Sequence, residues 1–460
     1  MKGLPEPPLD RDPPKDLERD RLSGRVARFA KVGAGLSGAV ASFGANALFG
    51  AGDAEARNAR ALREALGRLK GPLMKVAQMF ATVPDLLPPE FTAELTELQT
   101  NAPAMGPAFV RRRMAAELGA DWASKFAAFD LVPAAAASLG QVHRATAHDG
   151  RALAAKLQYP EMLSAVESDL GQLRLLLGLG RQLFGAVDTR EIAAEISERL
   201  REELDYEHEA AAMRLYRAFF EGRSDIAVPA PDEALSTGRL LTMEWLEGRG
   251  LQSFKSADQE TRNRLAKLLF EAWWTPLIKI GVIHGDPHLG NYSFTDGAGR
   301  LNLLDFGCIR VFPPAFVGGV VQLFRAMVAG DRSGEAAAYR AWGFAGLTDD
   351  LMDVLGIWAR FIYGPLLDDR VRTVADGVSP GAYGRREAFQ VKRTLEEKGP
   401  VTIPREFVFM DRAAIGLGSA FLHLDAAQNW RRLFEASLEG FSEAALAERQ
   451  SAALAATGLA

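Results

Sequence analysis

The sequence predicts an α+β fold of two lobes, preceded by a helical extension at its N-terminus. A chain of 460 residues is too long for one ordinary compact domain. Strand-like patterns are confined to the middle of the chain, between about Phe126 and Leu304, and the later part is mostly helical in pattern. A strand pattern at Arg239–Gly248 runs into a linker between the two regions. This order is typical of folds whose ligand cleft lies between two lobes.

Changes in composition divide the chain into four predicted regions. Residues 1–25 are charged and Pro-rich, which predicts a disordered leader. Residues 26–120 predict a helical extension, broken where Gly and Pro occur. We assign residues 121–248 to an N-terminal lobe with inserted helices, and residues 249–460 to a mostly helical C-terminal lobe.

Local patterns define the central elements. Residues 138–147 and 152–158 predict two strands, joined at His148–Arg151 by a turn that contains Asp-Gly. Residues 161–184 and 189–220 predict long helices, and residues 258–280 predict another. A second hairpin is expected around Asp296 and Gly297, with its second strand at residues 300–304.

Composition limits the function and the compartment. The chain has 54 basic and 59 acidic residues, which argues against general nucleic-acid binding. Cys308 is the only cysteine, so no intrachain disulfide can form and a reducing, cytoplasmic interior is expected. The uncharged stretch Val32–Gly50 is rich in small residues and weak as a membrane span, so a packing helix is favoured over a membrane-contacting one.

The strongest functional signal is a polar loop followed by a short hairpin. The loop carries Asp286 and, five residues later, Asn291, and the hairpin ends at Asp305 in an Asp-Phe-Gly sequence. Alone, Asp-Phe-Gly is a common turn, but the ordered combination is typical of kinase-like folds. Mg²⁺ prefers hard oxygen ligands such as an amide and a carboxylate. We therefore predict that ATP is the phosphoryl donor, that Asp286 orients or deprotonates the nucleophile, and that Asn291 and Asp305 hold Mg²⁺. His288, in the same loop, is interpreted as a loop histidine rather than a ligand.

Lys156 lies inside the second strand pattern. A charged side chain in a half-buried strand is costly unless it is paired. The position fits a lysine that contacts the α- and β-phosphates and pairs with a helix glutamate. The alternative is an outward-facing strand lysine, and the loop that carries Asp286 favours the phosphate role.

An alanine-rich segment, Pro133–Gly140, stands where a glycine-rich phosphate loop would lie, just before the first strand. Alanine has a Cβ and avoids positive φ, so this turn has fewer conformations and presses less closely on phosphates than glycine would. The alternative is the end of a poly-Ala helix. We assign nucleotide binding to Ala135, Ala136, Ala137 and Ser138 of this segment, and to Glu244, where the strand at Arg239–Gly248 approaches the linker.

Acidic residues cluster near the end of the predicted helix 189–220. Such a run is usually a solvated face. On a regular helix Glu203 and Asp205 lie about 200° apart, and Glu209 lies about 240° from Glu203, so they share no tight face unless the helix is distorted. We therefore expect these acids to have different roles, with one of them paired to Lys156.

Together these motifs resemble the UbiB/AarF family of atypical kinases, which includes the mitochondrial proteins that support coenzyme Q biosynthesis. The resemblance runs from about residue 61 to residue 310. It implies that Lys75 and Gln78, in a lysine-glutamine motif, belong to an extension that covers the cleft and contributes to catalysis. The family usually has glycine where this chain has Ala77. The resemblance also implies that Glu203 and Asp205 form the Glu-x-Asp motif that meets this extension, and that Glu209 is the glutamate paired with Lys156.

The sequence thus predicts a kinase-like fold with Mg²⁺-dependent ATP binding, and slow hydrolysis or phosphorylation of a small or lipid-like acceptor. After Asp305 only a few residues precede Pro313. No long peptide-docking segment is therefore expected, which lowers the expectation of ordinary protein phosphorylation. The resemblance implies support of ubiquinone or other isoprenoid-lipid metabolism at the inner face of a membrane.

Two alternatives stay open. One is a kinase that acts on proteins or small molecules, and Lys75 and Gln78 argue against it because such kinases lack the lysine-glutamine extension. The other is a non-catalytic, nucleotide-gated scaffold or lipid-binding protein, and the complete set of metal and phosphate residues argues against it. The partners left open are an isoprenoid lipid, a membrane surface and a second copy of the chain.

Overall fold

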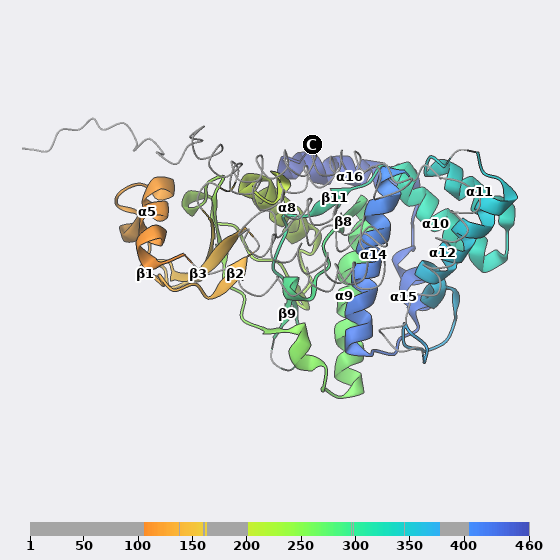
Figure 1. Cartoon of the computed structure of the whole chain (residues 1–460), viewed down its shortest axis with the longest axis horizontal. Helices are drawn as coiled ribbons and strands as arrows, with labels where there is room; N and C mark the ends of the chain where they lie inside the picture. The colour runs from red at the N-terminus through yellow and green to blue at the C-terminus, as the bar shows by residue number, and fades with distance from the viewer. Residues whose placement is uncertain are drawn as a thin grey trace, which may run out of the picture. The chain divides into compact units, whose positions relative to one another are not determined.

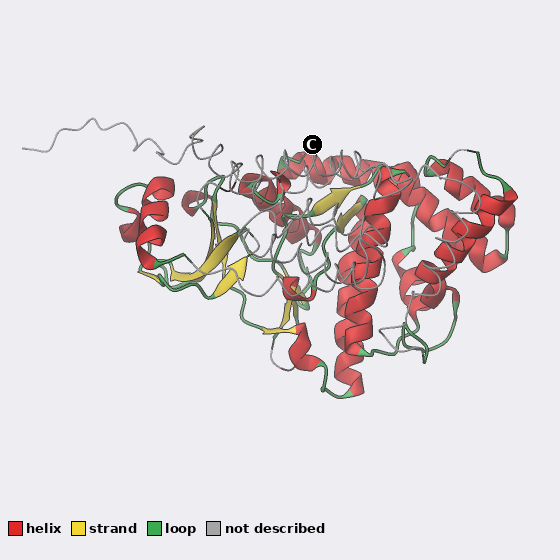
Figure 2. Ribbon diagram, in the orientation of Figure 1, coloured by secondary structure: helices red, strands yellow, loops and turns green. Residues whose placement is uncertain are grey.

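The computed structural model describes residues 105–159 except 138, residue 162, residues 201–377 except 296, 298 and 345, and residues 404–459. The chain divides into two compact units, and Figure 1 labels helices and strands of both. Unit 1 comprises Met1–Glu207 and Pro231–Trp245, and unit 2 comprises His208–Ala230 and Leu246–Ala460. Helices and small sheets both occur, which confirms the predicted α+β class (Figure 2). Most of the predicted N-terminal extension, including Val32–Gly50, lies outside the described residues, as do the inserted helices up to residue 200.

Unit 1 is built on an antiparallel sheet. Within its described residues the strand order is β1-β3-β4-β6, and β2 pairs with β3. Its elements are α5 (Pro107–Leu118), β1 (Ala128–Phe129), β2 (Ala135–Ala137), β3 (Gly140–Thr146), β4 (Ala152–Gln158) and β6 (Leu240–Glu244), with 3-10 turns at Trp122–Lys125 and Glu233–Leu235. Strand β4 lies between β3 and β6, so a residue on β4 is flanked by backbone on both sides.

The β3–β4 hairpin forms as predicted. Its register runs from Gly140 opposite Gln158 to Thr146 opposite Ala152. In the turn, Gly150 has a φ of +87°, which a glycine adopts without strain. The Ala147 amide closes the turn by donating to the Arg151 carbonyl at 2.9 Å.

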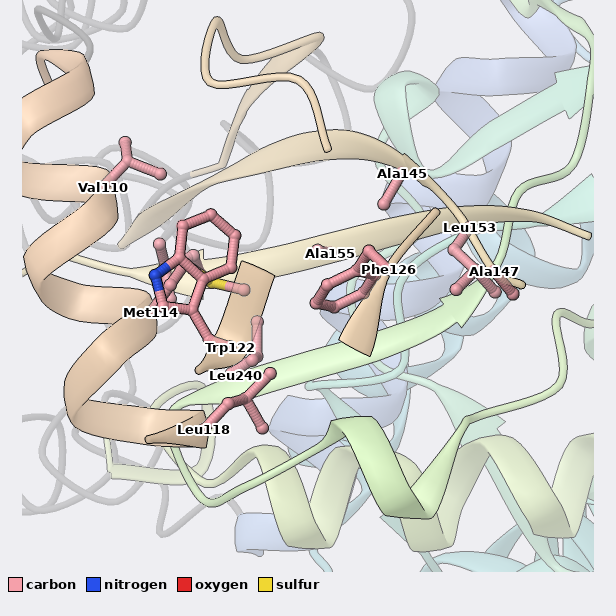
Figure 3. Close-up of a cluster of buried hydrophobic side chains, with 11 residues drawn as sticks. Val110, Met114, Leu118, Trp122, Phe126, Ala145, Ala147, Leu153, Ala155 and Leu240 are labelled. Carbon is pink, nitrogen blue, oxygen red and sulfur yellow. The ribbon is translucent and has the colours of Figure 1, made fainter. Parts of the chain in front are cut away.

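A hydrophobic core lies between α5 and the sheet of unit 1. Val110, Met114 and Leu118 are four residues apart, so they share one face of α5. Figure 3 shows this face together with Trp122 and with side chains from the strands, such as Leu240 of β6. The apolar spacing of α5 therefore fixes the helix on one side of the strand that carries Lys156.

A fully buried histidine links this sheet, through Gln141, to Met105, which lies two residues before α5. The His143 Nδ1 atom lies 2.7 Å from the Asp130 carbonyl, which can only accept, so Nδ1 carries the proton. The His143 Nε2 atom then accepts from the Gln141 amide nitrogen at 2.8 Å. The Gln141 side-chain oxygen in turn accepts from the Met105 amide at 2.8 Å. This arrangement requires a neutral His143.

Burial lowers the pKa of His143 below its ordinary value of 6.5, against smaller raising effects of Asp130. Below about pH 6.5 the unfolded chain therefore binds more protons than the native chain, and the free energy of unfolding falls as pH falls. We expect His143→Gln to reduce this loss. Chemical denaturation of both proteins at pH 7.5 and 5.5 measures it, and equal losses would contradict the assignment.

Unit 2 contains the remaining elements and most of a helix that begins in unit 1. Its strands form a sheet of order β5-β10-β9-β7 and a separate pair, β11-β8. The elements are α8 (Tyr206–Phe219), β5 (Ile226–Ala227), β7 (Arg249–Gly250), α9 (Gln259–Ile280), β8 (Val282–His284), β9 (Tyr292–Phe294), β10 (Leu301–Leu303), β11 (Ile309–Val311), α10 (Pro314–Ala329), α11 (Arg332–Ala341), α12 (Asp349–Leu367), α14 (Arg405–Leu424), α15 (Trp430–Ser437) and α16 (Glu443–Thr457), with 3-10 turns at Leu251–Phe254 and Leu289–Asn291.

Helix α9 forms the centre of unit 2. The Asp258 side chain caps its start by accepting from the Thr261 amide, and Gly281 ends it with a φ of +67°. Helices α14, α15 and α16 contact α9, and α14 runs beside it in Figure 1. The bounds of α9 confirm the predicted helix 258–280. The antiparallel pair of β9 and β10 confirms the second hairpin. Among the described residues, no helix has the length and apolar character needed to cross a membrane.

Candidate active site

The predicted polar loop joins β8 to a 3-10 turn in unit 2. The Asn291 side-chain nitrogen donates to the Asp286 carbonyl at 2.9 Å, and the His288 amide donates to the same carbonyl at 2.7 Å. The His288 Nδ1 atom accepts from the Gly290 amide at 3.1 Å, so His288 caps the turn within its own loop. The loop therefore fixes the backbone of Asp286 and the side chain of Asn291 in one hydrogen-bonded turn.

His284 connects this loop to the segment that carries Asp305. Its Nδ1 atom accepts from the Asp286 amide at 3.2 Å, so the ring proton lies on Nε2. The Nε2–H group then donates to the Asp305 carbonyl at 2.6 Å. One buried imidazole thus sets the spacing between the two loops. The two His284 bonds and the Asn291 bond bring Asp286, Asn291 and Asp305 together.

The Asp305-Phe-Gly segment is fixed by two further bonds. The Asp305 carboxylate accepts from the Gly307 amide at 3.0 Å, which orients the carboxylate. The Glu209 carboxylate, on α8, accepts from the Phe306 amide at 3.4 Å. Glu209 is only 1 % exposed, so this contact lies inside unit 2. Glu209 therefore positions the segment through its backbone.

Aromatic side chains support the segment from inside unit 2. Phe306 is fully buried and packs edge-on against Tyr216 of α8, with ring centroids 5.4 Å apart. Burial raises the pKa of Tyr292 well above its usual range, and the nearby Asp286 carboxylate adds to this. Tyr292 therefore stays a neutral phenol beside the loop at any ordinary pH.

The donor set fits Mg²⁺. The bond from the Asn291 amide nitrogen to the Asp286 carbonyl leaves the amide oxygen as the Asn291 atom able to act as a ligand. Asp305 supplies a carboxylate, and Mg²⁺ usually keeps several water molecules and takes one or two carboxylates with substrate phosphates. Among the described residues, no group of three or more His, Cys, Asp or Glu side chains could hold a metal by itself. An amide oxygen, a carboxylate and substrate phosphate oxygens match this preference of Mg²⁺.

The segment between Gly307 and the next helix is short, as predicted. Strand β11 begins two residues after Gly307 and pairs with β8, and α10 begins at Pro314. Gly285 makes this pairing close, since a Cβ there would lie 2.9 Å from the Cys308 carbonyl oxygen. No extended segment separates Gly307 from the next helix.

Helix α14, which is distant in sequence, packs against the polar loop. A Cβ at Gly416 would lie 2.9 Å from the ring of Pro287, the residue after Asp286. Gly418 lies two residues further along α14 and would meet nothing within 4 Å. Gly416 therefore allows the helix to approach the loop, and no sequence pattern near residue 416 indicated this.

Gly418→Ala should stabilise the protein by about 0.5–1 kcal/mol, because alanine favours the helix over glycine. Gly416→Ala has the same intrinsic gain, but its Cβ displaces Pro287, so this variant should be at least about 1 kcal/mol less stable than Gly418→Ala. Denaturation midpoints of the two variants measure this difference in stability, and their ATP hydrolysis rates are compared in parallel. Equal midpoints and equal hydrolysis rates would exclude the proposed contact.

The other predicted nucleotide residues lie in unit 1. Lys156 is on β4, opposite Val142 of β3 and Leu241 of β6, and only 9 % of it is exposed. This excludes the outward-facing alternative. Glu244 ends β6 and is exposed. Residues 135–137 form β2, paired antiparallel with β3, so the alternative of a helix end is wrong.

The predicted continuous helix 189–220 is wrong at the acidic motif. The chain turns at residues 203 and 204, and α8 begins only at Tyr206. The Leu204 and Asp205 amides donate to carbonyls three residues back, which tightens the chain into a turn. The helical angle between Glu203 and Asp205 therefore does not apply.

Some predictions stay untested. Lys75, Gln78 and Ser138 lie outside the described residues. The pairing of Lys156 with one acid, and the limits of the predicted domains, stay predictions. No role was predicted for His284, although its place two residues before Asp286 was a usable signal.

Comparison with known proteins places this site in a family. A model of the ABC1 atypical kinase-like domain matches residues 97–338, which is more than half of the chain. The chain belongs to the ABC1 atypical kinase-like family. This confirms the resemblance to UbiB/AarF proteins, and the matched range contains the polar loop, Lys156 and Asp305.

Relatives of this ABC1 chain come from several kinds of organism. It is 30 % identical to the mitochondrial atypical kinase COQ8 of Saccharomyces cerevisiae over 268 residues, which is 58 % of this chain and 54 % of the relative. It is 28 % identical to the mitochondrial atypical kinase COQ8B of Rattus norvegicus, covering 72 % of this chain and 65 % of the relative. It is 34 % identical to the chloroplastic protein ACTIVITY OF BC1 COMPLEX KINASE 7 of Arabidopsis thaliana, covering 54 % of this chain and 36 % of the relative. The chain thus spans between about a third and two thirds of these relatives.

A solved structure shares the fold. It is the Mycobacterium tuberculosis protein Rv3197 in complex with erythromycin, with a TM-score of 0.58 and 27 % sequence identity. The match covers 82 % of this ABC1 chain and 95 % of that one.

Proposed function

We propose that this ABC1 chain binds Mg-ATP, and hydrolyses it slowly or transfers its γ-phosphoryl group to a small or lipid-like acceptor. One observation carries the proposal: the His284 ring hydrogen-bonds both the loop of Asp286 and the segment of Asp305. Phosphoryl transfer depends on positioned charge, and this ring fixes the spacing of two charged groups. Membership of the atypical kinase-like family supports the same reaction class.

Each residue has a role in this proposal. Asp286 orients the attacking hydroxyl or water and takes its proton, as the bond between the γ-phosphorus and the bridging oxygen breaks. Asn291 and Asp305 hold Mg²⁺, which neutralises phosphate charge when bound.

Three further residues have roles in this proposal. Lys156 contacts the α- and β-phosphates. His284 and Glu209 are positioning residues, since their contacts are with backbone atoms of the segments that carry the acids.

The biological role we propose is support of ubiquinone or other isoprenoid-lipid metabolism, at the inner face of a membrane. Mitochondrial atypical kinases named COQ8 and COQ8B among the relatives support this role. The short path from Gly307 to α10 favours a small or lipid-like acceptor over a docked peptide.

A thermal-shift assay tests nucleotide binding. A ligand that binds only the native state at 100 times its Kd stabilises that state by about 2.7 kcal/mol. We expect ATP and Mg²⁺ together to raise the melting temperature, and each alone to raise it far less. ADP release over hours, measured in the same samples, separates hydrolysis from binding. An unchanged melting temperature at millimolar Mg-ATP would contradict the proposal.

A further inference from the structure

Two contacts fasten the acidic turn before α8 to strand β4 in unit 1. The Lys156 ammonium lies 5.2 Å from the centroid of the Tyr206 ring. Two residues further along β4, the Gln158 side-chain nitrogen donates to the Leu204 carbonyl at 2.6 Å. Lys156, Gln158 and Tyr206 are 9 %, 3 % and 2 % exposed. These contacts are therefore shielded from water and do not belong to a solvated face.

The alternation of side chains along β4 explains why both contacts lie on one face of the sheet. Successive strand side chains alternate between the faces of a sheet, so Lys156 and Gln158 point to one face. The turn at residues 203–205 crosses that face, and its carbonyl at Leu204 meets Gln158. Glu203 and Asp205 flank Leu204, so the Gln158 bond fixes the part of the chain that carries both acids.

The contact between the ammonium and the ring is chemically specific. A buried charge needs compensation, and the face of an aromatic ring is negative at its centre. The Tyr206 ring therefore attracts the ammonium although Tyr206 itself carries no charge. Tyr206 is buried and opens α8, so its ring is held by the helix.

We propose that Tyr206 is a positioning residue for Lys156. Its ring aims the ammonium at the nucleotide phosphates, while Gln158 fixes the Glu203–Asp205 turn relative to the same strand. This inference rests on the proposed function, because it takes Lys156 as a phosphate contact. It adds that nucleotide affinity depends on the π face at position 206, and not on the tyrosine hydroxyl or on apolar volume.

A pair of variants tests this in the full-length protein. Tyr206→Phe keeps the ring and should bind Mg-ATP within about twofold of the wild type. Tyr206→Leu keeps apolar bulk but lacks the π face, and should weaken Mg-ATP binding about 3- to 10-fold. In a Lys156→Met background, Tyr206→Leu should have no further effect on affinity, because the two residues act as one unit.

Fluorinated phenylalanines at position 206 keep the shape of the ring and withdraw charge from its face. Mg-ATP affinity should fall stepwise from the mono- to the di- and trifluoro ring, and this series also serves if Tyr206→Leu fails to fold. Equal affinity along the series, or equal affinity of the Phe and Leu variants, would overturn the inference. If the unmutated protein binds no Mg-ATP, the proposed function itself fails, which is a different result.

Discussion

Asp305→Asn is expected to abolish the Mg²⁺-dependent stabilisation of the protein by ATP. Asparagine has the shape of aspartate and can still accept a hydrogen bond from the Gly307 amide, which now lies 3.0 Å from the Asp305 carboxylate. It lacks the negative charge that the proposed Mg²⁺ site needs, since the other protein ligand, Asn291, is neutral. A thermal-shift titration with Mg-ATP measures the loss, which should approach the whole of the wild-type shift.

The matched control is Asp349→Asn, at the exposed first turn of α12. It makes the same chemical change on a side chain that is 97 % exposed, and should leave the Mg-ATP shift at the wild-type value. A wild-type shift in Asp305→Asn would contradict its assignment as a metal ligand. Loss of the shift in both variants would point to an effect of net charge instead.

His284→Ala should destabilise unit 2 by about 2–4 kcal/mol and weaken Mg-ATP binding as well. The ring is only 4 % exposed, and its loss leaves the Asp286 amide and the Asp305 carbonyl without their shared partner. Each unsatisfied buried polar group costs about 1–3 kcal/mol. Chemical denaturation gives the change in unfolding free energy, and a nucleotide titration gives the change in affinity.

His148→Ala is the comparison for this variant. His148 is exposed in the β3–β4 turn, with one ring contact to the Ser124 carbonyl, and its loss should cost less than about 1 kcal/mol. If His284→Ala matched His148→Ala in stability, the imidazole would not hold the two loops together. If it lost stability but kept full nucleotide affinity, the spacing of Asp286 and Asp305 would not matter for binding.

Features set by local chemistry could be predicted from the sequence. Asp-Gly in a short polar stretch specifies the turn between β3 and β4, and the cap at Asp258 and the glycine at 281 specify the ends of α9. The loop from Asp286 to Asn291 was also predictable, because its residue types and spacing carry the chemistry.

Features set by contacts between distant residues could not be predicted. The helical pattern continued through residues 203–205, but the Gln158 bond to the Leu204 carbonyl and the tight backbone turn replace the helix there. The approach of Gly416 to Pro287 joins positions far apart in the chain. The His284 tautomer likewise follows only from the partners that folding supplies.

The most direct test of the central claim is a crystal structure with Mn²⁺ in place of Mg²⁺ and a non-hydrolysable ATP analogue. Mn²⁺ has an anomalous signal and accepts the same oxygen ligands. We predict an anomalous peak in direct coordination, at about 2.1 Å, with the Asn291 amide oxygen and with an Asp305 carboxylate oxygen, and with analogue phosphates completing the ligand set. A nucleotide bound elsewhere, or a metal that contacts neither residue, would contradict the account.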